Sequence, residues 1–266
     1  MENESSNTLK LPPIGVGTYD LKEEQILDAI NVGYRLIDTA SQYGNEEAVG
    51  KAVRRSGISR NDILVSTKLW NEDIRQRRTR EAFFESLRRL DMDYVDLFLI
   101  HWPAEGYEQA WIEMEKLHNE GYIRAIGVSN FHKKHFEVLE GVLSIRPVVN
   151  QIESHPRFHN QDLIDYCKDR GMQIQAWSPF GGTGARMLQN DVLVRIAQKH
   201  QKSSSQIALR WHTQRGIIPL PRSANKYRLR LNTDIFDFEL DCEDMLLIDS
   251  IDTKKRLGAN PEAFDF

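Results

Sequence analysis

Short apolar runs alternate with amphipathic stretches along almost the whole chain. The apolar runs are rich in β-branched and large side chains, which is typical of strands buried on both faces. We expect strands at residues 14–18, 36–37, 63–67, 95–100, 123–129, 148–152, 173–177 and 217–220.

The amphipathic stretches between these runs have the periodicity of helices. Phe83, Phe84 and Leu87, for example, recur at the spacing that places side chains on one helical face. Gly121 and Gly171 stand where two of the stretches should stop. We expect helices at residues 23–32, 46–55, 79–90, 107–120, 133–142, 161–170, 191–200, 204–214, 226–232 and from 241 onward.

This alternation predicts eight strand–helix units. Right-handed crossovers between parallel strands close such a series into a single α/β domain, a (β/α)8 TIM barrel over residues 1–266. A doubly wound open sheet is the alternative, but it usually has fewer units and a glycine fingerprint, and Gly15-x-Gly17 lacks the third glycine. The glycines of residues 181–184 follow the seventh strand, and we expect a mobile loop over the catalytic rim there rather than a domain boundary.

Composition narrows the class of protein. A chain of 266 residues fits one barrel, and a net charge of -4 with interspersed signs gives no footprint for nucleic acid. The basic cluster at residues 75–80 is interpreted as a solvated loop and helix start. Cys167 and Cys242 lack CxxC spacing, residues 1–7 are polar, and no apolar stretch is long enough to span a membrane. We therefore expect a soluble, cytoplasmic monomer.

Ionisable side chains follow three of the expected strands. Asp38, Lys68 and His101 each end an apolar run, and Tyr43 comes five residues after Asp38. The carboxyl ends of parallel barrel strands meet at one rim, where catalytic residues lie. The sequence therefore predicts that an acid, a phenol, a base and an imidazole converge there.

These residue types suit the reduction of a carbonyl group, which needs a hydride for carbon and a proton for oxygen. Tyr43 can donate the proton, and the Lys68 ammonium should favour the phenolate and lower its pKa. Asp38 would hold Lys68 in place and keep it charged. His101 would donate a hydrogen bond to the carbonyl oxygen and stabilise developing negative charge.

The order and spacing of seven segments resemble the motifs of the aldo-keto reductases. The segments are residues 33–46, 66–70, 99–103, 126–131, 149–151, 175–179 and 218–223. The compact length resembles the bacterial 2,5-diketo-D-gluconate reductase branch. The resemblance implies the same four roles for Asp38, Tyr43, Lys68 and His101.

The resemblance also implies a nicotinamide cofactor. Ser129, Asn130 and Gln151 match the carboxamide ligands of the family, and Trp177 matches the aromatic residue that stacks on the nicotinamide ring. Three further residues match its cofactor cleft, Ser178 and Pro179 over the pyrophosphate and Thr18.

The phosphate end of the cofactor site favours NADPH over NADH. Arg222, Ser223 and Arg228 match the family's 2′-phosphate site, and Asn232 matches an adenine ligand. The family usually has Lys at position 222 and Glu at position 231, where this chain has Leu231. We expect phosphate binding to survive both changes.

The expected substrate is a small-molecule carbonyl compound. Tyr19, Trp70, His101 and Trp102 match the substrate cleft of the family, and the connection at residues 103–106 is short, which predicts an open pocket. Phe264 or Phe266 can still reach the rim.

No metal site is expected, because four histidines are interpreted as surface or loop residues: His132, His135, His155 and His159. Two other functions remain open. One is a cofactor-binding, redox-sensing regulatory subunit with little turnover, and the other is a metal-dependent barrel hydrolase.

Overall fold

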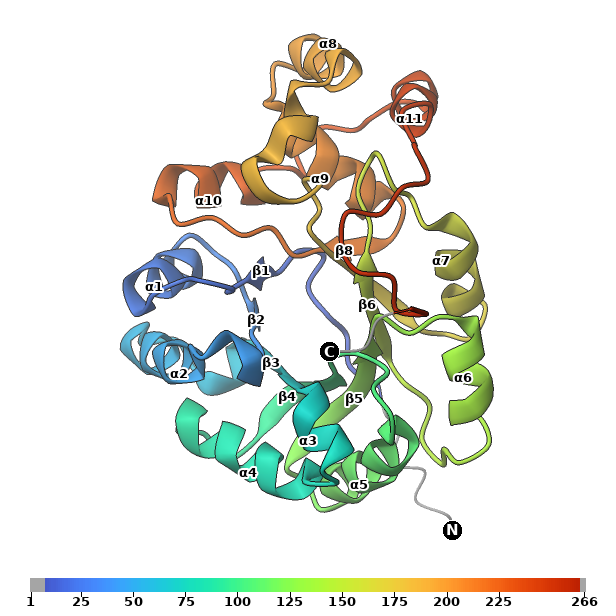
Figure 1. Ribbon diagram of the computed structural model, residues 1–266. Coiled ribbons are helices and arrows are strands. Elements are labelled where there is room, and N and C mark those ends of the chain that lie inside the picture. The colour runs from blue at the N-terminus through green and yellow to red at the C-terminus, as the bar shows by residue number, and fades with distance from the viewer. Residues whose placement is uncertain (1–7, 264–266) are drawn as a thin grey trace.

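A computed structural model describes residues 8–263, in which eight parallel strands form one sheet in chain order (Figure 1). The strands are β1 (Val16–Gly17), β2 (Leu36–Asp38), β3 (Leu64–Leu69), β4 (Val95–Ile100), β5 (Ile123–Ser129), β6 (Val149–Glu153), β7 (Gln173–Trp177) and β8 (Ile217–Pro219). Each strand pairs only in parallel with its neighbours in the sequence, as repeated right-handed crossovers require.

Backbone hydrogen bonds join the first strand to the last and close the sheet. Gly15 N donates to Pro219 O, and Gly17 N donates to Pro221 O, both at 3.1 Å. A Cβ atom at Gly15 would lie 2.7 Å from the Leu220 side chain, so the close approach requires glycine. The prediction of a (β/α)8 barrel is confirmed.

Helices surround the sheet (Figure 1). They are α1 (Glu23–Asn31), α2 (Glu46–Arg55), α3 (Asn71–Arg75), α4 (Thr79–Leu90), α5 (Tyr107–Asn119), α6 (Lys133–Leu139), α7 (Gln161–Lys168), α8 (Asp191–His200), α9 (Ser204–Gln214), α10 (Lys226–Thr233) and α11 (Cys242–Asp249). Short 3₁₀ segments are η1 (Ser41–Tyr43), η2 (Arg60–Asp62) and η3 (Thr183–Gln189).

The helix α2 packs closely against the end of α4. A Cβ atom at Gly50 would lie 1.9 Å from Leu90 O, a distance that no side chain can occupy. The glycine therefore sets how near the two helices approach.

Apolar side chains fill the interior of the barrel at the end where the strands begin. Leu36, Leu97, Leu99 and Val149 are buried inside it, and Leu11 packs against them from the segment before β1. This segment lies at the end where the strands begin. The other end, where the strands terminate, is the one left for a site.

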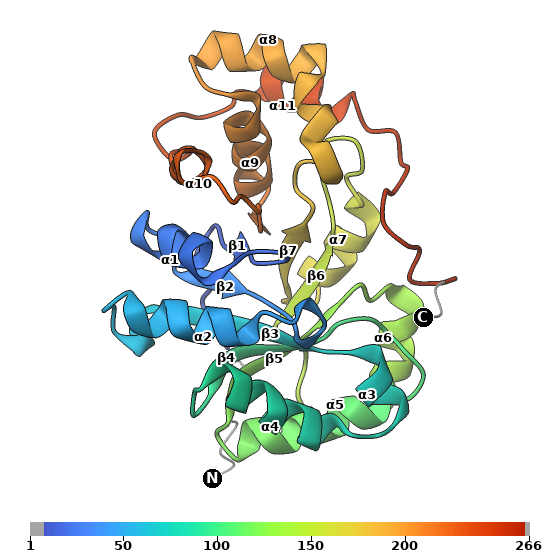
Figure 2. The same ribbon diagram turned by 60° about the vertical axis from the view of Figure 1, so that its left-hand side comes forward.

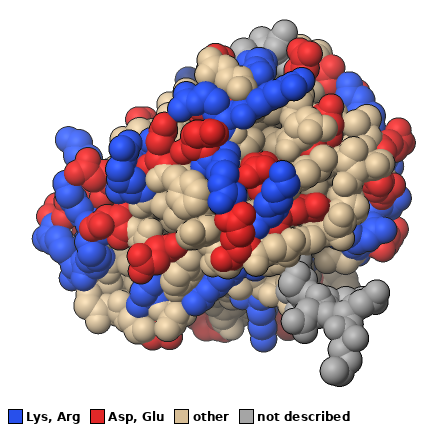
Figure 3. Space-filling view, turned by 90° about the horizontal axis from the view of Figure 1, so that it is seen from below, with Lys and Arg blue, Asp and Glu red and all other residues tan. Residues whose placement is uncertain are grey.

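The chain after α11 runs along the molecule to the region of α6 (Figure 2). Acidic and basic side chains alternate over the face seen in Figure 3. The basic cluster spans the end of α3 and the start of α4, where Arg78 pairs with Glu85 at 2.9 Å and Arg80 with Glu120 at 2.6 Å. Within residues 8–263, no helix is both long and apolar enough to cross a membrane.

Candidate active site

Four of the predicted residues lie together at the carboxyl ends of β2, β3 and β4. Lys68 Nζ is fully buried and donates to Asp38 Oδ2 at 2.6 Å and to Thr39 O at 2.8 Å. The same nitrogen lies 5.0 Å from the centre of the Tyr43 ring. The His101 ring meets the Tyr43 ring edge to face, with centroids 5.8 Å apart.

A network around Asn45 holds the turn that carries Tyr43. Asn45 Nδ2 donates to Thr18 O at 2.7 Å and to Leu21 O at 3.1 Å, and its Oδ1 accepts from Thr39 Oγ1 at 2.9 Å. These bonds tie η1 to the loop after β1. The turn that carries Tyr43 is thereby held by the Asn45 side chain against the loop after β1 and against Thr39.

Burial controls the protonation of Tyr43. Removal of the phenol from water raises the pKa of Tyr43 above its usual value, and the attraction of Lys68, which lowers it, is the weaker effect. The sequence-based expectation of a net lowering is therefore wrong for this structure. The phenol keeps its proton throughout the neutral range.

The other two titratable groups respond to the same surroundings. Burial would lower the pKa of Lys68, but Asp38 and Tyr43 outweigh it and leave the pKa raised. Burial and the neighbouring charge of Lys68 hold the pKa of His101 well below its usual value. Lys68 is therefore a buried cation, and His101 is a neutral imidazole.

Gln151 extends this cluster from the acid toward β7. Its Nε2 donates to Asp38 Oδ1 at 2.9 Å and to Gln175 Oε1 at 2.8 Å, which uses both of its N–H groups. The hydroxyl of Ser129 donates to Gln151 O at 2.9 Å. Asp38 thus accepts from a cation on one oxygen and from an amide on the other.

Asn130 links three of the predicted positions. It has a left-handed backbone, with φ at 63°, and its Nδ2 donates to His101 O and to Ser129 Oγ, each at 3.0 Å. Its Oδ1 accepts from Trp177 Nε1 at 2.8 Å. The amide nitrogens of Asn130 and Gln151 are therefore both engaged, and Gln151 Oε1 and the second lone pair of Asn130 Oδ1 remain as acceptors for a ligand.

Aromatic rings border the cluster. The Tyr19 ring lies 5.2 Å from that of Tyr43, and the Trp70 ring lies 5.1 Å from that of His101. Tyr19 is exposed over 55% of its surface, so this wall faces solvent.

Trp102 borders a recess of about 60 Å³ whose lining includes a residue of the C-terminal segment. Its lining residues are Asn71, Arg75, Trp102, Pro103, Ala104, Glu105 and Pro261. Pro261 belongs to the C-terminal segment, which therefore lies beside the short connection at residues 103–106, and the open pocket stays a prediction. Phe264 and Phe266 lie outside the described residues.

The phosphate-site candidates lie where the chain leaves β8 for α10. Arg222 is exposed, with Nη2 3.6 Å from Asp20 Oδ2, and Arg228 Nε donates to the buried Ser223 Oγ at 3.4 Å. Asn232 is 3% exposed, and its side chain bonds to the Tyr34 hydroxyl, so it offers little surface to an adenine ring.

The remaining cofactor candidates lie on turns next to these groups. Thr18 is buried, and its hydroxyl donates to Asp38 O at 3.0 Å. Ser178 has a positive φ of 50°, and Ser178 O accepts from Gly181 N at 2.9 Å. Pro179 lies within that same turn.

Three of the four histidines of the sequence interpretation are buried, and His132, which directly precedes α6, is half-buried. His155 and His159 do lie on the loop between β6 and α7, but both are buried, as is His135 on α6. His159 Nε2 bonds to Pro156 O at 3.0 Å, and such backbone partners make burial tolerable. Within residues 8–263, no group of three or more His, Cys, Asp or Glu side chains is arranged to hold a metal ion.

Sequence reasoning missed Asn45, Gln175 and Glu153 as members of the site. Asn45 and Gln175 fall inside matched segments but had no assigned role. Glu153 ends β6 and is buried, so a charged residue directly after an apolar run was the available signal.

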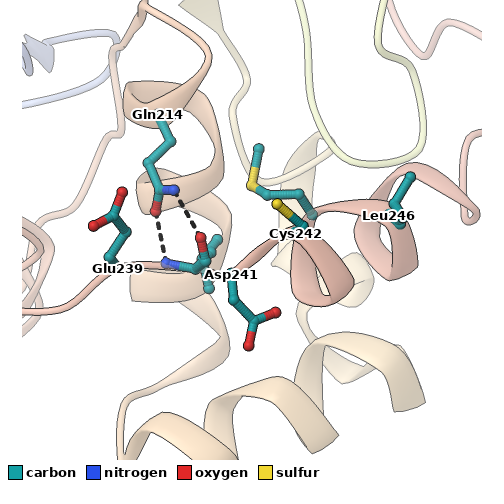
Figure 4. Close-up of a pocket in the computed structure, with 7 residues that line it drawn as sticks. Gln214, Glu239, Asp241, Cys242 and Leu246 are labelled. Carbon is teal, nitrogen blue, oxygen red and sulfur yellow. Dashed lines mark hydrogen bonds between the residues drawn. The ribbon is translucent and has the colours of Figure 1, made fainter.

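A larger hollow of about 760 Å³ lies away from this rim, between the end of α9 and α11 (Figure 4). Gln214 bonds to both backbone groups of Leu240 beside it, at 2.8 and 2.9 Å. The hollow is lined by Gln214, Glu239, Leu240, Asp241, Cys242, Met245 and Leu246, none of which is a predicted site residue.

Comparison with known proteins places this arrangement among oxidoreductases. The family model described as "Aldo/keto reductase family" matches residues 14–253. The glyoxal reductase of Bacillus subtilis is 45% identical, over 98% of this chain and 96% of its own length. The methylglyoxal reductase DkgA of Escherichia coli is 38% identical, over 96% of this chain and 94% of its own. The crystal structure of MGS-M4, an aldo-keto reductase enzyme from a Medee basin deep-sea metagenome library, has a TM-score of 0.94 and 42% identity over 98% of both chains.

Proposed function

The chain belongs to the aldo/keto reductase family, and from that premise we propose that it reduces aldehydes, ketones and α-dicarbonyl compounds to alcohols with NADPH. The observation that carries the proposal is the buried Lys68–Asp38 ion pair beside the Tyr43 phenol and the neutral His101. A cation in that place has no purely structural advantage, because burying it is costly.

Tyr43 is the proposed proton donor. Its raised pKa keeps it protonated at neutral pH, and the O–H bond breaks as the proton passes to the carbonyl oxygen. The phenolate that remains is stabilised by Lys68, whose own charge is maintained by Asp38. When bound, the nicotinamide supplies the hydride for the carbonyl carbon.

His101 orients the substrate. A neutral imidazole has a single N–H, and we assign that group to the carbonyl oxygen, on which negative charge develops. The T-shaped contacts with Tyr43 and Trp70 hold the ring in place.

The donor set fits NADPH. Asn130 Oδ1 and Gln151 Oε1 are acceptors suited to the two N–H groups of a carboxamide, since both amide nitrogens are already engaged. Trp177 offers a ring for stacking. Arg222 and Arg228, with the Ser223 hydroxyl that Arg228 Nε contacts, suit a dianionic 2′-phosphate.

The names of the related reductases and the aromatic side chains beside the site support the proposed substrate class. Glyoxal reductase and methylglyoxal reductase are named for small α-dicarbonyls, and the aromatic wall of Tyr19, Trp70 and Trp102 suits small flat carbonyl compounds. The cytoplasmic location and the monomeric state remain predictions.

The test is NADPH oxidation with glyoxal, methylglyoxal, a keto sugar and a simple aldehyde, with and without a metal chelator. We expect turnover that chelation leaves unchanged. Tyr43→Phe should lower it about 10²–10⁴-fold while NADPH affinity, measured by fluorescence titration, stays the same.

Two outcomes would contradict the proposal. Tight NADPH binding with negligible turnover on every carbonyl would favour the redox-sensing alternative. A Tyr43→Phe variant that kept more than about a tenth of wild-type turnover would remove Tyr43 as the acid.

A further inference from the structure

A buried carboxylate at the end of β6 holds the C-terminal segment against the rim. Glu153 is 1% exposed, and its Oε1 accepts from Leu257 N at 2.6 Å while its Oε2 accepts from Gly258 N at 3.1 Å. His155 Nε2 lies 3.3 Å from Oε1, and Arg256 Nη1 lies 3.8 Å from Oε2. We call residues 256–262 the C-terminal strap.

The strap meets the ring of Trp177. A Cβ atom at Gly258 would lie 2.3 Å from Trp177 Cη2, so only glycine allows this approach. The contact is with the six-membered end of the indole. At the other end, Trp177 Nε1 donates to Asn130 Oδ1 at 2.8 Å. The indole is therefore held at both ends, and one of the two holds depends on Glu153.

The strap has a second, separate anchor. His132 Nδ1 and Glu262 Oε1 are 2.6 Å apart, and Lys134 Nζ donates to Glu262 O at 3.3 Å, which ties its far end to the start of α6 (Figure 2). None of these contacts involves Trp177 or Glu153 directly. Arg256 links the two anchors, because its Nη2 lies 3.2 Å from His132 Nε2 and its Nη1 lies 3.8 Å from Glu153 Oε2.

The groups around the Glu153 carboxylate favour its charged form. Burial alone would raise the pKa of Glu153, but His155 and the two strap N–H groups hold it below its ordinary value. A buried charge is retained where several donors converge on it, and here two of those donors belong to the strap.

We propose that Glu153 is a positioning residue which, through the backbone of Leu257 and Gly258, fixes the Trp177 indole in the place where the nicotinamide stacks. The identity of the stacked ligand rests on the proposed function. The coupling between the strap and the indole does not depend on that function.

The coupling is tested without cofactor or activity, by ¹⁹F NMR of protein labelled with fluorotryptophan. The chain has five tryptophans, and the Trp177 resonance is the one absent from Trp177→Phe. In Glu153→Gln that resonance should shift or broaden while the others stay in place. Glu262→Gln, the same carboxyl-to-amide change at the second anchor, should move it much less, because Glu262 reaches Glu153 only through His132 and Arg256.

The functional consequence is tested by NADPH titration. Glu153→Gln should raise the Kd about tenfold, since one charge-assisted anchor is lost. The KM of the carbonyl substrate should change much less, because Tyr43 and His101 are untouched. In a Trp177→Phe background the further effect of Glu153→Gln should nearly vanish, because the two act on one contact.

Gly258→Ala gives a second route that leaves Glu153 intact. Its methyl group would enter the space of Trp177 Cη2, so the same resonance and the same Kd should change. An unmoved Trp177 resonance in both Glu153→Gln and Gly258→Ala would overturn the proposal. A shifted resonance in a protein that does not bind NADPH would instead overturn the proposed function alone.

Discussion

The burial of Lys68 is the feature on which the proposed proton transfer depends. Its ammonium is fully buried and is held by Asp38 and Thr39, so its field acts on Tyr43 without bulk screening. A lysine on the surface at the same separation would be strongly screened. The position of the charge, more than its presence, gives the phenol its proposed role.

Replacing this lysine should move the pH dependence of the reaction. Reduction needs the phenol form of Tyr43, so its rate should be level through neutral pH and fall as the phenol ionises in alkali. Lys68→Met removes an effect that lowers the pKa of Tyr43, so turnover should fall sharply and the remaining decline should lie at higher pH. A pH–rate profile of kcat checks this.

The matched control is Lys51→Met, which changes an exposed lysine on α2 that pairs with Glu47 at 2.7 Å. Its profile should follow the wild type. A decline at lower pH in Lys68→Met would show that Lys68 does not act on Tyr43.

Arg222 should decide between the two nicotinamide cofactors. Arg222→Ala should weaken NADPH binding about ten- to a hundredfold, since a charge-assisted contact is worth roughly 1.5–3 kcal/mol, and should leave NADH binding nearly unchanged. Paired Kd values for the two cofactors give the answer. Arg230→Ala, which changes an exposed arginine on the following helix α10, is the control. Equal losses for NADPH and NADH would place Arg222 outside the phosphate site.

Helices with a clear amphipathic periodicity were predictable to the residue. The helices α2, α4, α8 and α9 begin and end where periodicity and stop signals put them. By contrast α3 has five residues, too few for a periodic pattern, and was missed. The strand β3 runs on to Leu69 because Lys68 is buried within it, whereas a charged residue reads as the end of an apolar run.

The site was predictable where its members end consecutive strands. Asp38, Lys68 and His101 come from neighbours in the barrel, so their order in the sequence is also their order in space. The partners of Glu153 are different, because Leu257 and Gly258 follow it by about a hundred residues and contribute only backbone groups. A side chain that binds distant backbone leaves no pattern in a sequence.

The contact between α2 and α4 should be sensitive to one methyl group. Gly50→Ala would gain about 1 kcal/mol from helix propensity, but its Cβ would overlap Leu90 O, a backbone atom that cannot turn aside. Overpacking typically costs about 1–3 kcal/mol, so we expect a net loss of unfolding free energy.

Denaturant titration measures this change. Lys51→Ala on the exposed side of α2 should stay within about 0.5 kcal/mol of the wild type. A more stable Gly50→Ala protein would mean that α2 and α4 can separate without cost.

For the molecule as a whole, substrate choice depends on how little covers the rim. The connection at residues 103–106 is short, and the described part of the C-terminal segment adds Pro261 beside Trp102. Few contacts are available to groups remote from the carbonyl, so KM values for small aldehydes and α-dicarbonyls should be in the millimolar range. Turnover should follow carbonyl electrophilicity more than the shape of the rest of the molecule.

The measurement is kcat/KM across small aldehydes, α-dicarbonyls and one bulky ketosteroid. A preference of about a hundredfold for the steroid would require some 2.7 kcal/mol of extra binding energy and would contradict this view of the rim.

The closure of the barrel through Gly15 and Gly17 has a consequence for the newborn chain. Their acceptors, Pro219 and Pro221, are synthesised about two hundred residues later. At roughly 5–20 residues per second, a ribosome needs about ten to forty seconds to cover that interval. Throughout it, the edge of β1 that these residues later occupy stays unpaired. The proposed 2′-phosphate site lies beside this seam, where the Arg222 guanidinium lies over the Tyr19 ring at 5.9 Å from its centre, so it is among the last parts of the protein to form.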